Sequence, residues 1–132
     1  MSFRFDTSVI EHLKRRADEV RAPQTELAER YIEEGLRRDQ HPLIYFRDGA
    51  AGRRPALYGT RLDVADVIST IRQNNSSVEQ AAEYLEMPVE QAEAALRYYA
   101  DFKEDVDDWT AQTEAVADRE RARWERQQEA LA

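Results

Sequence analysis

The chain has 132 residues, of which 42% are hydrophobic and 35% charged, and its 27 acidic and 19 basic side chains give a net charge of −8 at neutral pH. The absence of cysteine excludes disulfide bridges and thiolate zinc sites, and with two histidines we expect neither a histidine-built metal site nor a catalytic triad. No apolar stretch has the length of a membrane span, and the first residues lack the apolar core of a signal peptide. We therefore expect a small cytoplasmic protein without a membrane segment.

The charge is distributed unevenly along the chain. Residues 1–42 carry a net charge of −1, residues 43–72 carry +2, and residues 73–132 carry −9. Because acidic surfaces repel the phosphates of nucleic acids, any contact with DNA is expected in the first half of the chain.

The first segment predicts one short strand and two helices. Residues 2–6 alternate in polarity, with Phe3 and Phe5 on one side. Apolar residues at helical spacing then predict a helix that ends before Pro23 and a second helix at about 24–38. A lone strand cannot pair its backbone groups, and about 40 residues cannot bury a core, so we expect two copies whose strands pair into an antiparallel ribbon.

Residues 2–38 resemble the ribbon-helix-helix DNA-binding family. The likeness rests on the alternating strand, on Asp6 just before the first helix, and on the Thr-Glu-Leu opening of the second helix at 25–27. Two positions depart from the family pattern. Arg21 stands where the family often has glycine, and Pro23 stands where it often has a capping serine.

The resemblance implies that residues 1–42 form an intertwined homodimer whose ribbon enters the major groove of operator DNA. Arg4 would be the best reader of sequence, because a guanidinium can contact guanine at two positions. The implied contacts are base edges for Ser2, Arg4 and Asp6, and one phosphate held by the first amides of the second helix, near Gln24 and Thr25.

The middle of the chain, 43–108, predicts a β-hairpin followed by three helices. Two β-prone runs flank a turn that contains glycine, and Ser77 and Pro88 are typical of helix starts. The expected elements are strands at 43–48 and 56–62, helices at about 64–71 and 78–85, and a long helix from Pro88 to Val106. The expected fold class is therefore mainly α: ribbon-helix-helix, hairpin, three-helix domain of helix-turn-helix type and helical tail.

This middle part resembles a small bacterial family, domain-of-unknown-function family 433, over roughly residues 43–108. The likeness rests on Gly59-Thr60-Arg61 before an apolar residue, on three helices of helix-turn-helix type, and on a closing Tyr98-Tyr99 with Val106-Asp107. The would-be recognition stretch, 77–86, carries three glutamates and no basic residue, so we do not expect it to be the main reader of DNA.

Two basic features of the middle part leave alternatives open. Arg61 could bind a phosphate or a carboxylate, or it could brace the hairpin through Asp105 or Asp107. Arg53 and Arg54 at the hairpin tip could contact phosphates or pack in a dimer. The acidic run at 101–108 is expected to be a solvated helix surface rather than a magnesium site.

Residues 109–132 predict a helical tail that binds a partner. At about 100° per residue, its apolar residues form a narrow stripe flanked by arginines. Such a ridge suits a groove beside an acidic pocket, with a solvated helix or packing on the dimer mate as the alternatives. The expected contact residues are Trp109, Val116, Arg119, Arg123, Trp124, Arg126 and Leu131.

A dimeric DNA-binding head joined to such a tail resembles the antitoxins of type II toxin–antitoxin systems that are paired with PIN-like ribonuclease toxins. The resemblance implies that the head binds the operator of its own operon, while tail and second domain cover the toxin and a tail arginine enters its acidic, Mg²⁺-holding site. The alternative is a stand-alone dimeric ribbon-helix-helix regulator. No glycine-rich phosphate loop or catalytic constellation is recognisable, so we expect no enzyme, no metal and no cofactor.

Overall fold

The computed structural model describes residues 2–49 and 52–132, and within them it has six helices and two strands. The expectation of a mainly helical chain with one antiparallel hairpin is confirmed, although the hairpin turn at Ala50 and Ala51 lies outside the described residues. The chain divides into two compact units, unit 1 at residues 1–40 and unit 2 at residues 41–132.

The boundary between the units falls before His41 because this side chain is buried in unit 2. The His41 ring meets Tyr98 edge-on at a centroid distance of 5.2 Å, and its Nε2 lies 2.8 Å from a carboxylate oxygen of Asp101. His41 was expected to close the first segment, whereas its packing makes it the first residue of the second unit.

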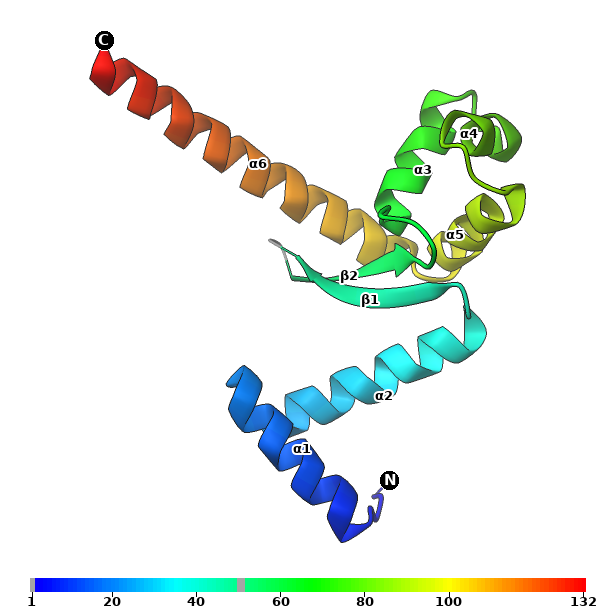
Figure 1. Cartoon of the computed structure of the whole chain (residues 1–132), viewed down its shortest axis with the longest axis vertical. Helices are drawn as coiled ribbons and strands as arrows, with labels where there is room; N and C mark the ends of the chain where they lie inside the picture. Colours follow the sequence, from blue (N-terminus) through cyan, green and yellow to red (C-terminus); the bar gives the residue numbers. More distant parts are fainter. Residues whose placement is uncertain (1, 50–51) are drawn as a thin grey trace. The chain divides into compact units, whose positions relative to one another are not determined.

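Unit 1 consists of helix α1, Thr7–Val20, and helix α2, Gln24–Gln40, which are coloured blue and cyan in Figure 1. Helix α1 begins after Asp6, whose backbone carbonyl accepts the amides of the first turn. It ends at Arg21, which adopts the left-handed conformation with φ 54° and ψ 45°. The unusual φ explains why glycine suits this position, because glycine alone adopts it without steric cost.

The predicted strand at 2–6 is not formed in the single chain. These residues have no regular secondary structure, and the rings of Phe3 and Phe5 are exposed, stacked on each other at 6.1 Å. A strand needs a neighbour to pair its backbone groups, so its formation depends on a second copy, and the ribbon remains a prediction.

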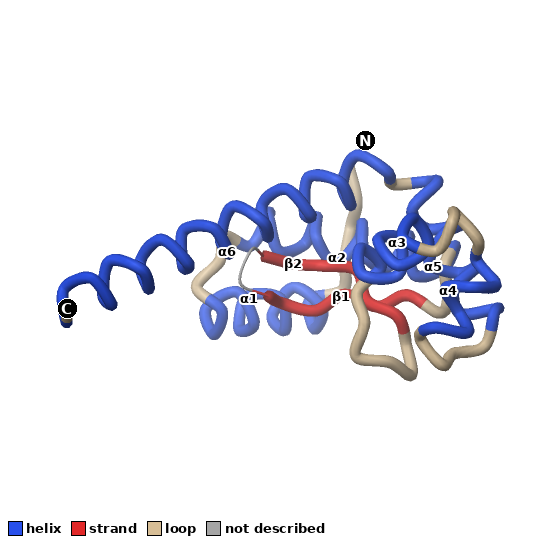
Figure 2. The backbone as a smooth tube through the Cα atoms, turned by 90° about the horizontal axis from the view of Figure 1, so that it is seen from above, coloured by secondary structure: helices blue, strands red, loops and turns tan. Residues whose placement is uncertain are grey.

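Unit 2 begins with an antiparallel hairpin of β1, Ile44–Gly49, and β2, Gly52–Leu57 (Figure 2). The prediction of the second strand at 56–62 is wrong, because residues 52–55, expected in the turn, already pair with β1. The register sets Ile44 opposite Leu57 and places both in the core. Gly59 follows the hairpin with a φ of 79°, which an L side chain rarely adopts.

Three helices complete the body of unit 2: α3, Val64–Gln73; α4, Val78–Tyr84; and α5, Val89–Asp101. Ser77 caps α4 as predicted, since its hydroxyl accepts the amide of Gln80 at 3.2 Å. Helix α5 packs against both α3 and α4 and supplies the core with Tyr98, the largest fully buried side chain.

The last helix, α6, runs from Lys103 to Leu131, and its C-terminal half projects away from the other elements of unit 2 (Figure 1 and Figure 2). The prediction of one helix from Pro88 to Val106 is wrong, because Phe102 leaves the helical conformation with φ −130° and ψ 42°. Its ring packs against Tyr98 at 4.9 Å. The tail predicted from residue 109 is therefore the continuation of a helix that starts within the body.

Replacing Arg21 by glycine should raise the free energy of unfolding by about 0.5–1 kcal/mol, because the left-handed conformation costs an L residue energy that glycine does not lose. The matched control is Lys14→Gly in the exposed interior of α1, which should lower stability by about 1 kcal/mol. Urea unfolding of the full chain, followed by helical circular dichroism, measures both. Equal destabilisation by the two glycines would contradict the strain at Arg21.

Candidate functional site

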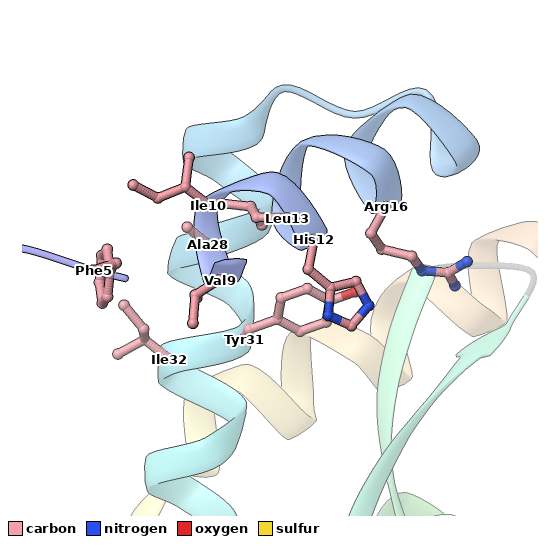
Figure 3. Close-up of a pocket in the computed structure, with 9 residues that line it drawn as sticks. All are labelled: Phe5, Val9, Ile10, His12, Leu13, Arg16, Ala28, Tyr31 and Ile32. Atoms are coloured by element: carbon pink, nitrogen blue, oxygen red, sulfur yellow. The ribbon is translucent and has the colours of Figure 1, made fainter. Parts of the chain in front are cut away.

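Unit 1 exposes an apolar hollow between its two helices. The cavity measures about 480 Å³, and among residues 2–40 of unit 1 only Ala17 and Leu27 are buried hydrophobics. Tyr31 and Ile32 of α2 are nearly half exposed and point into the hollow beside α1 (Figure 3). The described residues that line the cavity are Phe5, Val9, Ile10, His12, Leu13, Arg16, Ala28, Tyr31 and Ile32.

The edge of this hollow is polar. His12 and Arg16 of α1 lie at this edge, and Figure 3 shows the Arg16 side chain pointing outward from the helix. Arg16 donates to Glu19 at 3.0 Å, and this hydrogen bond raises the pKa of Arg16 above its ordinary value. An apolar centre with a polar edge is typical of a surface that binds another protein.

The predicted DNA contacts are all solvent-exposed in unit 1. Ser2 and Arg4 lie in the extended N-terminal segment, and Asp6 is the N-cap residue of α1 without a side-chain capping hydrogen bond. Gln24 and Thr25 form the first turn of α2. The single chain leaves Ser2 and Arg4 without a strand that would set the direction of their side chains.

Helix α6 has a buried root and an exposed distal part. Val106 and Trp109 belong to the protein interior, with Trp109 only 8% exposed, and Val116 is half-buried. The prediction that Trp109 belongs to a free partner-binding stripe is therefore wrong. Trp124 and Leu131, at 59% and 83% exposed, remain available.

The exposed part of α6, residues 117–131, carries its charges on opposite flanks. At about 100° per residue, Arg119, Arg123 and Arg126 fall on one side of the Trp124–Leu131 stripe. Asp118, Glu125 and Glu129 fall on the other side, and Asp118 lies 3.5 Å from Arg121. All six predicted flank residues are exposed.

The sequence reasoning missed a partly buried ion-pair cluster at the base of the hairpin. Arg47 and Arg54 are direct cross-strand neighbours, a pairing of like charges that is unfavourable alone. The Asp63 carboxylate lies between them. Its Oδ1 accepts Nη2 of Arg47 at 2.7 Å, and its Oδ2 lies 3.2 Å from Nε of Arg54. The hydrogen bond to Asp63 raises the pKa of Arg47.

Asp63 also caps helix α3. It forms a capping box with Asp66, in which the Asp66 carboxylate accepts the Asp63 amide at 2.9 Å. The Asp-x-x-Asp spacing before an apolar run was the available signal for the cap, but nothing in the spacing pointed to the two arginines. The Arg54 guanidinium in turn lies 5.8 Å from the centre of the Trp109 ring, so one carboxylate links the hairpin, α3 and the root of α6.

Arg61 does not brace the hairpin through Asp105 or Asp107. Its side chain is exposed, and its backbone carbonyl accepts Nη2 of Arg47 at 3.0 Å. The bracing role expected of Arg61 therefore belongs to Arg47 and Arg54. Arg53 donates to the Phe46 carbonyl at 3.3 Å.

Asp107 takes part in a different contact, with Tyr99 of α5. Arg72 donates to the Tyr99 hydroxyl at 2.6 Å, and that hydroxyl donates to Asp107 at 2.8 Å. The hydrogen bond from Tyr99 lowers the pKa of Asp107 below its ordinary value. Its contribution to stability is therefore present at neutral pH and is lost when the pH falls low enough to protonate Asp107.

Comparison with known proteins identifies one domain. Residues 44–99 match the family described as protein of unknown function (DUF433), from the start of β1 through most of α5. No curated protein and no solved structure matches the chain. A DUF433 domain thus occupies the body of unit 2, which includes Asp63 and the hairpin.

Two further properties concern the described residues alone. None of their helices is both long enough and apolar enough to span a membrane. Within residues 2–49 and 52–132, no group of three or more histidine or acidic side chains is arranged to hold a metal ion.

Asp63→Asn should lower the free energy of unfolding by about 2–3 kcal/mol, because it leaves two largely buried guanidinium groups facing each other without a counter-charge. Asp48→Asn is the matched control, since the Asp48 carboxylate is exposed and lies 3.5 Å from Arg53. Its loss should cost less than about 0.5 kcal/mol. Urea unfolding measures both, and similar small losses would contradict the linking role of Asp63.

Proposed function

We propose that this chain is the antitoxin of a type II toxin–antitoxin pair: a homodimer that neutralises a PIN-like ribonuclease and represses its own operon by binding operator DNA. The observation that carries the proposal is that large apolar side chains are uncovered on each of two separate units: Tyr31 and Ile32 on unit 1, and Trp124 and Leu131 on unit 2. One uncovered apolar surface indicates one binding partner. Two such surfaces on separate units suit a protein that binds two partners, here a second copy of the chain and a ribonuclease.

The hollow of unit 1 suits a second copy of the chain. A ribbon-helix-helix dimer would cover Tyr31 and Ile32 and would pair the two segments at 2–6 into strands. The alternation of these segments then sends Phe3 and Phe5 toward the helices and Ser2 and Arg4 toward DNA. The exposed amides at Gln24 and Thr25 would hold a phosphate.

The exposed part of α6 suits the toxin. Trp124 is a large aromatic side chain that water solvates poorly, and aromatic and arginine residues are the usual anchors of interfaces. A ribonuclease that holds Mg²⁺ with a cluster of acids offers an acidic pocket to Arg119, Arg123 or Arg126. An arginine inserted there would compete with the metal for the carboxylates. The three-helix body of unit 2, proposed to be of helix-turn-helix type, would anchor the start of α6.

A stand-alone dimeric regulator is the second candidate. The burial of Trp109 and the half-burial of Val116 favour it, because they shorten the free stripe to Trp124 and Leu131. In that case the head alone would act on DNA, and α6 would have no external partner.

The dimer is tested by Ile32→Arg in the full chain. A charged side chain in the apolar hollow should convert a dimer into a monomer, as measured by light scattering after size exclusion. Arg15→Glu, an exposed residue of α1 outside the hollow, is the control and should stay dimeric. A wild-type chain that is monomeric at micromolar concentration would exclude the ribbon.

The two functions are tested by two variants that should each lose only one activity. Arg4→Ala should weaken binding to the DNA upstream of its own operon by about 1–3 kcal/mol in a mobility-shift assay and still protect cells from the ribonuclease encoded beside it. Arg123→Ala with Trp124→Ala, or a chain ending at Val116, should bind DNA and fail to protect. Ending at Val116 keeps the buried Trp109 in place.

Matched controls remove an arginine at another position, to show that the loss of one positive charge does not by itself cause the effect. Arg15→Ala should leave DNA binding unchanged, and Arg121→Ala should leave protection unchanged because Arg121 lies 3.5 Å from Asp118 on the opposite flank. Full protection by the shortened chain would remove the tail from neutralisation. The absence of any neighbouring ribonuclease that binds the chain would favour the regulator.

A further inference from the structure

A cavity lies where α6 leaves the body of unit 2. It measures about 450 Å³, between the base of the hairpin, the start of α3 and the α6 segment from Trp109 to Glu114. Its wall holds three guanidinium groups, those of Arg47, Arg54 and Arg61. The wall also holds the carboxylates of Asp63, Asp66 and Glu114.

The cavity and the exposed stripe of α6 lie on the same face of that helix. At about 100° per residue, Thr110 and Thr113 in the cavity wall fall within about 60° of arc together with Ala117, Trp124 and Leu131. A single protein surface that covers the exposed stripe can therefore also contact the cavity at the base of α6.

Most charges of the cavity already have partners. The Asp63 carboxylate is engaged by Arg47 and Arg54, and Asp66 accepts the Asp63 amide. The Arg61 side chain is exposed and makes no hydrogen bond or ion pair to the described residues. The Nε of Arg54 is buried and has no hydrogen-bond partner there, because its contact with Asp63 has ion-pair distance without hydrogen-bond geometry.

We propose that this cavity receives an aspartate or glutamate side chain of the protein that covers the exposed part of α6, with Arg61 as its main cation. The inference rests on the proposed function and names a second point of contact for the same partner. A single carboxylate fits the charges better than a free phosphate, because Asp63, Asp66 and Glu114 also line the cavity and repel a dianion. A carboxylate carried by a docked protein gains from the contacts along α6 as well.

The test uses the full chain and the unaltered ribonuclease encoded beside it, without RNA in the sample, with affinity measured by calorimetry. Arg61→Glu should weaken binding at least about tenfold, and Arg61→Lys should weaken it less because it retains the charge. Arg97→Glu, an exposed arginine of α5 outside the cavity, is the matched control and should change affinity less than about threefold. Circular dichroism confirms that each variant is folded.

A second measurement locates the contact independently of any substitution. Hydrogen exchange on the wild-type complex should show protection at 58–63 and 109–114 in addition to 117–131. If protection is confined to 117–131 and Arg61→Glu binds as wild type does, the cavity proposal is wrong while the antitoxin function stands. If the wild-type chain does not bind the ribonuclease, both are wrong.

Discussion

The carboxylate of Asp63 is the interaction on which the arrangement of unit 2 depends. It separates two arginines that the hairpin register places directly opposite each other, and it caps the helix that follows. Through Arg54 it is also linked to Trp109 at the root of α6. Because the carboxylate, Arg47 and Arg54 are all largely shielded from water, their attraction is weakly screened.

Unit 1 presents the opposite situation, with little interior of its own. Ala17 and Leu27 are its buried hydrophobics, while Tyr31, Ile32 and the two N-terminal phenylalanines remain in water. A helix pair of this size buries too little apolar area to offset the entropy lost on folding. Its stability is therefore expected to depend on whatever covers the hollow, which links folding to association in the proposed dimer.

Helix α6 is both part of the core of unit 2 and an exposed surface for a partner. Its first turns are core structure held by Trp109 and by the Tyr99–Asp107 hydrogen bond, and its last four turns extend the same face into solvent. A helix rooted in this way presents Trp124 in a defined direction, which lowers the entropy lost when a partner binds. Truncations intended to remove only the tail should therefore begin after Val116.

Local patterns in the sequence were sufficient to predict much of the secondary structure. Alternation and glycines indicated the hairpin, and apolar spacing indicated α1 to α4. The Ser77 cap and the break at Pro88 marked two helix starts. These signals are reliable because they depend on contacts within a few residues. The DUF433 domain was recognisable for the same reason, since the Gly59-Thr60-Arg61 run on which the resemblance rested is contiguous.

Only the tertiary structure decided the features that join distant residues. Arg47 and Asp63 are sixteen positions apart, and no spacing rule selects Asp63 over other acids as the partner of the two arginines. The helix break at Phe102 follows from packing against Tyr98 and His41, which no local propensity reports. Trp109 and Trp124 fall on one stripe in the sequence, yet one is buried and the other exposed. Periodicity determines which face of a helix is apolar, whereas the folded body determines how far along the helix that face is covered.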